Sequence, residues 1–183
     1  NQVATWENLK QQRQQHPYDI IHIATHGEFN PGEASNSFIE LWDQKLSLDD
    51  IPALNWHDPP VSLLVLSACR TAVGDQYAEL GFAGLAVQAG AKSAIASLWY
   101  ANDAGTLGLM SEFYQHLKVA PTKAEALRQA QIAMLSGKVR LQEGNIIGTF
   151  GSVTLPSELE ALGDLSLQHP YYWSGFALIG SPW

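Results

Sequence analysis

The chain has 183 residues, of which 46% are hydrophobic and 15% are charged, a composition that indicates one globular domain and excludes a disordered segment. Its 18 acidic residues outweigh 10 basic ones and give a net charge of −8, which argues against nucleic acid or an anionic membrane as the main partner. The single cysteine excludes an internal disulfide and a cysteine-based zinc site, so we expect a reducing, cytoplasmic environment.

The chain shows no targeting or membrane signal. No apolar run approaches the ~20 residues that span a bilayer, and no signal peptide is visible. The sequence begins with Asn and enters a polar stretch directly. We therefore expect a fragment of a longer protein.

Hydrophobic periodicity divides the chain into alternating strands and helices. In chain order it predicts a polar helix over 3–15, a strand over 18–25, a hairpin over 37–43 and 44–48, a strand over 61–68, a helix over 77–89, a strand over 93–100, helices over 104–117 and 122–135, and a strand over 174–180. Residues 136–170 are rich in Gly, Ser and Pro and predict an irregular, functional loop region. This order favours a single α/β domain, residues 1–183, with a mostly parallel sheet.

Chemically reactive residues follow three of the predicted strands. His26, Cys69 and Asp103 come from the sequences THGEF, SACRT and WYAND. Because reactive groups of parallel α/β sheets gather beyond the carboxyl ends of the strands, we expect these residues along one edge. An imidazole accepts the proton of a nearby thiol, so His26 and Cys69 would form a base and a nucleophile. The residues alone leave open the alternative that Cys69 is a small buried core residue.

Neighbouring groups extend this candidate site. Gly27 lacks a side chain, and its N–H together with that of Cys69 would stabilise an oxyanion. Asp103 would cap the next helix, receive a cationic substrate side chain, or do both. Asp75 and Glu79, which follow the cysteine, are further candidates for contact with substrate.

A second histidine precedes the first candidate by four residues. His22 shares a strand face with His26, and we expect it to be a hydrogen-bonded structural residue. Along a strand the two imidazoles would be more than ~13 Å apart, which excludes a shared metal ion. We expect neither a metal nor an organic cofactor.

Six segments follow one another in the order seen in CHAT domains, from about residue 19 to the end: DIIHIATHGEF, LLVLSACRT, AGAKSAIASLWYANDAGT, FYQHL, ALRQAQIAML and HPYYWSGFALIG. The chain resembles this caspase-like group of cysteine peptidases, which is related to separases and metacaspases. The resemblance implies a caspase-like three-layer sandwich with a mostly parallel central sheet. Its first strand would precede residue 1 and leave a sheet edge exposed. The sequence is similar to the type attached to tetratricopeptide repeats, which implies such repeats in the same chain.

The resemblance also implies roles for individual residues. His26 matches the family's base, Cys69 its nucleophile, and Gly27 and Cys69 its oxyanion donors. Asp103 matches an acidic position that receives a P1 arginine in separases. We therefore expect a cysteine endopeptidase that cleaves a protein or peptide substrate after Arg or Lys, without a cofactor.

One departure from the family pattern lies beside the nucleophile. Arg70-Thr71-Ala72 stands where many relatives have Glu-Thr-Gly, and the glycine is delayed to Gly74. This change keeps open the alternative of a catalytically weak or inactive scaffold module that binds other proteins. A different acyl transfer at the same pair of residues is a third hypothesis.

Overall fold

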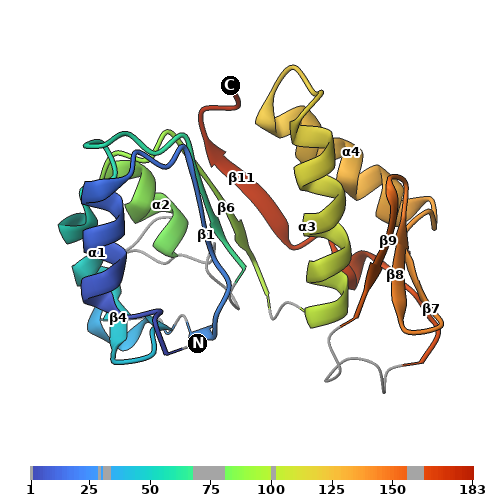
Figure 1. The fold of residues 1–183 in the computed structure, drawn as a ribbon, viewed down its shortest axis with the longest axis horizontal. Helices are drawn as coiled ribbons and strands as arrows, with labels where there is room; N and C mark the ends of the chain where they lie inside the picture. Colours follow the sequence, from blue (N-terminus) through green and yellow to red (C-terminus); the bar gives the residue numbers. More distant parts are fainter. Residues whose placement is uncertain (1, 29, 31–33, 68–80, 100–101, 156–162) are drawn as a thin grey trace. The chain divides into compact units, whose positions relative to one another are not determined.

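The computed structural model describes residues 2–28, 30, 34–67, 81–99, 102–155 and 163–183. They form two compact units, Asn1–Tyr100 with Phe176–Ser181 and Ala101–Gly175 with Pro182–Trp183 (Figure 1). No helix in these ranges combines the length and the apolar character that crossing a bilayer requires.

The first unit is built on a four-stranded sheet in the order β1-β5-β6-β11. The strands are β1 (Ile20–Ile23), β5 (Leu63–Leu66), β6 (Ser93–Ser97) and β11 (Phe176–Gly180). β1, β5 and β6 are parallel, and β11 pairs antiparallel with β6. The expectation of a mixed α/β fold with a mostly parallel sheet is therefore confirmed.

Burial explains why the aliphatic runs form the middle of this sheet. All residues of β5 and β6 are buried, as expected for strands of a parallel sheet. β1 lies at the edge, and within the described ranges no strand pairs with its outer side. Its residues alternate between exposed and half-buried.

Two helices of the first unit lie on the same side of the sheet (Figure 1). They are α1 (Trp6–Gln15) and α2 (Gly81–Gln88). α1 begins where Thr5 caps it by accepting a hydrogen bond from the Asn8 N–H, because a hydroxyl oxygen satisfies one of the unpaired amides of the first turn. α2 contributes Phe82 to the core cluster, and Leu9 of α1 packs against that cluster.

A small antiparallel sheet adjoins this core in the order β2-β3-β4. It consists of β2 (Gly27–Glu28), β3 (Phe38–Glu40) and β4 (Lys45–Ser47), and it is accompanied by the 3-10 helices η1 (Ala34–Asn36) and η2 (Leu48–Leu54). β3 and β4 are the predicted hairpin, with Glu40 opposite Lys45. Ile39 and Leu46 are fully buried, so this sheet packs against the core of the first unit.

The second unit contains two helices and a second antiparallel sheet. The helices are α3 (Asp103–Leu117) and α4 (Lys123–Leu135), and the sheet has the order β10-β7-β8-β9. Its strands are β7 (Arg140–Gln142), β8 (Asn145–Gly148), β9 (Gly151–Thr154) and β10 (Leu165–Ser166), and the 3-10 helix η3 (Pro170–Tyr172) follows them.

The prediction of an irregular loop over residues 136–170 was wrong for the described part of that range. Four short strands occupy it. They are only two to four residues long, and Gly144 between β7 and β8 and Gly151 at the start of β9 have positive φ angles. Local periodicity is weak in strands of this length, because pairing with distant residues decides their conformation.

Candidate functional site

The two strands that precede the predicted dyad end side by side. Ile20 pairs with Leu63 and Ile23 with Leu66 in a parallel register. The pairing continues one step further, because the Ser67 N–H donates to the Ile23 carbonyl at 3.1 Å. The carboxyl ends of β1 and β5 therefore meet at one edge of the sheet, as the sequence predicted.

The backbone at His26 is held by β3. The Glu40 N–H donates to the His26 carbonyl at 2.8 Å. The Thr25 hydroxyl donates to the Glu40 carbonyl at 2.6 Å. The bend between β1 and β2 is thus tied to β3 on both sides of the Thr25–His26 peptide.

Strand pairing also orients His26 and Gly27. Gly27 lies opposite Ile39, and the Glu40-to-His26 bond makes this a non-hydrogen-bonded pair. The Gly27 N–H is therefore directed away from β3. Ile39 points into the core, so the side chain of His26, one residue from Gly27, emerges on the opposite face. His26 is exposed, where a base has access to a substrate.

His22 makes a side-chain hydrogen bond, as expected for a structural histidine. Its Nε2 lies 2.7 Å from the Ser67 hydroxyl oxygen, which joins β1 to the residue after β5. Desolvation lowers the pKa of His22, because removing water disfavours the charged ring. An imidazole with a lowered pKa is neutral at pH 7 and has one nitrogen that donates and one that accepts.

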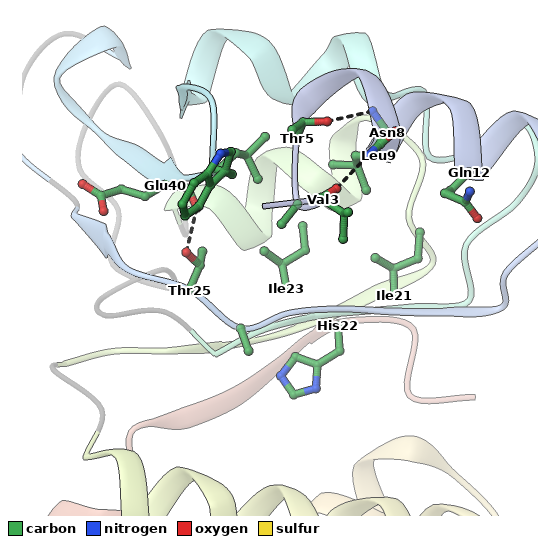
Figure 2. A pocket seen from close by; sticks show the side chains of 14 residues that line it. Val3, Thr5, Asn8, Leu9, Gln12, Ile21, His22, Ile23, Thr25 and Glu40 are labelled. Atoms are coloured by element: carbon green, nitrogen blue, oxygen red, sulfur yellow. Dashed lines mark hydrogen bonds between the residues drawn. The ribbon is translucent and has the colours of Figure 1, made fainter. Parts of the chain in front are cut away.

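A cavity of about 590 Å³ lies on the face of β1 opposite the His22 side chain. Figure 2 shows Ile21 and Ile23 pointing into it and His22 pointing away from it. Its described lining comes from α1 and the residues before it, from β1 and the residues after it, and from the end of β3 and the turn that follows; it includes Thr25 and Glu40 but not His26. This cavity is therefore separate from the exposed face that carries His26.

Asp103 is the first residue of α3 and is exposed. The helix cap is its neighbour Asn102, whose side-chain oxygen accepts from the Gly105 N–H at 3.0 Å. Capping by Asp103 was therefore a wrong prediction, off by one position. Its carboxylate remains favourably placed in the first turn, where the helix dipole stabilises negative charge.

Three predicted site residues, Cys69, Asp75 and Glu79, lie outside the described residues. Among the residues that the structure does describe, no group of three or more His, Cys, Asp and Glu side chains is arranged to hold a metal ion.

Sequence reasoning missed three residues that support the strand ends. Ser67 binds His22, while Thr25 and Glu40 fix the bend at His26. Thr25 and Ser67 are hydroxyl residues directly after aliphatic strands, which was the available signal. Glu40 acts through its backbone, so no side-chain pattern marks it.

Comparison with protein-family models matches residues 1–181 to the CHAT domain. No curated protein matches the chain.

Proposed function

Because the chain belongs to the CHAT domain family, which is related to caspase-like cysteine peptidases, we propose that it is a cysteine endopeptidase with Cys69 as nucleophile and His26 as base. The substrate is a polypeptide, cleaved after Arg or Lys. The observation that carries this proposal is the parallel register of β1 and β5.

The register supports the dyad because His26 and Cys69 lie equally far along the chain from the ends of their strands. Ile23, the last residue of β1, pairs with Leu66, the last residue of β5. His26 follows Ile23 by three positions, and Cys69 follows Leu66 by three positions. Because β1 and β5 end at paired residues, the equal spacing favours a meeting of His26 and Cys69 at one edge of the sheet.

In the proposed reaction His26 removes the proton from the Cys69 thiol, and the thiolate attacks the scissile carbonyl carbon. The amides of Gly27 and Cys69 donate to the oxyanion of the tetrahedral intermediate. The direction of the Gly27 N–H, away from β3, supports this role. His26 then protonates the leaving amine, and water hydrolyses the thioester to regenerate the thiol.

The proposed specificity depends on acidic side chains. Asp103 receives the cationic P1 side chain, and its exposure in the first turn of α3 supports the role because the carboxylate is accessible to a substrate. Asp75 and Glu79 are proposed as further contacts for a basic substrate. The net charge of −8 adds a weak attraction for basic segments.

The test is hydrolysis of fluorogenic peptides that differ only in a P1 Arg, Lys or Asp. We expect turnover of the Arg and Lys peptides, loss of turnover in Cys69→Ala and His26→Ala, and a raised KM for the Arg peptide in Asp103→Asn. A preference for P1 Asp would refute the specificity. Turnover that persists in Cys69→Ala would refute the mechanism.

The same preparation tests the alternative of an inactive binding module. A peptide electrophile with P1 Arg should label the wild-type chain and fail to label Cys69→Ala. If neither chain is labelled under any condition, while both are folded, the endopeptidase proposal fails and the scaffold hypothesis is retained.

A further inference from the structure

A side-chain contact links the two strands from which the proposed base and nucleophile follow. His22 is the third residue of β1 and lies opposite Val65, whereas Ser67 directly follows β5. The 2.7 Å contact between His22 Nε2 and Ser67 Oγ therefore runs diagonally toward the carboxyl ends of both strands. It lies on the face of β1 opposite the cavity (Figure 2).

Ser67 is held to β1 by two bonds of different kinds. Its N–H donates to the Ile23 carbonyl at 3.1 Å, and its hydroxyl pairs with the His22 ring. The backbone bond fixes the position of Ser67 along the axis of β1, and the side-chain bond restricts the χ1 rotamer of Ser67. Together they fix the position of Ser67, the residue directly after β5, relative to β1.

The His22 ring is itself confined by the segment that follows it. Four residues later the backbone at His26 is tied to β3 through the Glu40 N–H, and the Thr25 hydroxyl reinforces this tie. The chain from His22 to His26 is thus anchored to β5 at one end and to β3 at the other. A change at the first anchor alters where the second one lies relative to β5.

We propose that His22 and Ser67 are a positioning pair whose hydrogen bond aligns the end of β5 with the end of β1, and so sets the geometry between the nucleophile and the base. This inference rests on the proposed function. Neither residue is assigned a contact with substrate. The pair acts through the residues that follow it, four positions on from His22 and two from Ser67.

A positioning role predicts a loss in kcat with little change in KM, because the binding of substrate does not involve the pair. Small misplacement of reacting groups is costly, and we expect Ser67→Ala to lower kcat roughly 10-fold. Ser67→Thr retains the hydroxyl and should recover most of this loss. His22→Gln retains a side-chain nitrogen near the position of Nε2 and should lie between the wild type and His22→Phe.

A second readout does not require peptide turnover. The chain has one cysteine, so the rate of alkylation by iodoacetamide reports Cys69 alone. In the wild type the pH profile of alkylation should have a midpoint below the ordinary thiol pKa of ~8.5, because a nearby imidazole stabilises the thiolate. Ser67→Ala should move this midpoint toward the ordinary value, and Ser67→Thr should restore it. A purely structural role would lower the melting temperature without moving the profile.

The two readouts separate failure of this inference from failure of the proposed function. If the wild type hydrolyses the Arg peptide and Ser67→Ala is folded with unchanged kcat and an unchanged alkylation midpoint, the positioning pair is refuted and the peptidase stands. If the wild type has no turnover but Ser67→Ala shifts the alkylation midpoint, the peptidase is refuted and the pair stands. An ordinary thiol profile in the wild type, without turnover, refutes both. Should Ser67→Ala not fold, His22→Gln and His22→Phe decide the question by the same measurements.

Discussion

The side chain of Arg13 is the most extensively bonded buried cation of the first unit, among the described residues, and its removal is a sharp test of the fold. It is 4% exposed. Its Nε donates to the Leu54 carbonyl at 3.1 Å, and its Nη2 donates to the carbonyls of Asn55 at 2.6 Å and Pro59 at 3.3 Å. The guanidinium also lies 4.7 Å from the centre of the Trp56 ring. Arg13 therefore links α1 to the end of η2 through hydrogen bonds.

The expected loss follows from these contacts. A hydrogen bond from a charged donor contributes about 1.5–3 kcal/mol, and a cation–π contact about 0.5–2 kcal/mol. The four contacts share one group, and its burial has a desolvation cost, which also lowers the pKa of Arg13. We therefore expect Arg13→Met, which keeps the aliphatic stem, to lower the free energy of unfolding by about 3 kcal/mol rather than by the sum. Arg13→Lys, with one nitrogen and no planar fork, should lose about half of that amount.

Urea unfolding followed by circular dichroism measures this effect. The matched control is Arg128→Met on α4, since Arg128 is exposed and forms an ion pair with Glu125. An exposed pair contributes little to stability, because water and salt screen it. If Arg13→Met and Arg128→Met unfold at the same urea concentration with the same slope, the reasoning about the buried guanidinium is wrong.

Three further predictions concern other parts of the chain. Thr25→Val removes the donor at the bend before β2 and should lower the free energy of unfolding by about 1 kcal/mol and lower kcat, whereas Thr25→Ser should behave as wild type; a fully active, stable valine variant would contradict this. Hydrogen bonds from Arg128 and Gln129 lower the pKa of Glu125 to about 2. This carboxylate therefore stabilises the fold above its unfolded pKa of ~4.3, and the contribution is lost as the pH falls toward 2. NMR titration of Glu125 should show a low midpoint that rises in Arg128→Met, and a normal midpoint in the wild type would disprove the pairing. Gly90 has a φ of +110°, and an added Cβ would lie 2.6 Å from the Cβ of His57. Gly90→Ala should therefore lower the free energy of unfolding by about 2 kcal/mol, measured by thermal or urea unfolding. An unchanged melting temperature would show that the turn relaxes.

Hydrophobic pattern predicted those elements whose residues are buried on a continuous face. The aliphatic run that became β5 and the helices that became α3 and α4 are of this kind, because burial of a regular face dominates their local preference. The strands between residues 140 and 166 escaped prediction. Each is too short to show a period, and each is stabilised by cross-strand partners elsewhere in the chain. Leu165, for example, lies opposite Leu141, 24 residues earlier.

The candidate site divides in a similar way. Chemical identity marked His26, Gly27 and Asp103 in the sequence, and the register of β1 and β5 agrees with the expectation that reactive residues follow strands that end together. The pairing of Asp103 with a substrate and the role of Cys69 stay predictions. The supports at Thr25 and Ser67 carried only a weak signal, since a hydroxyl after a strand has many possible partners until the strands are paired.

From residue order alone one can determine which groups are able to do chemistry and which family the chain resembles, because both depend on residue type and spacing. Only the folded structure decided that His22 contacts Ser67, that the Gly27 amide is directed away from β3, and that Asn102 rather than Asp103 caps α3. These features depend on strand register and on the residue at which a helix starts. A shift of one residue in strand register would exchange the faces on which the side chains lie, and a shift of one residue in the helix start would change which side chain caps the helix.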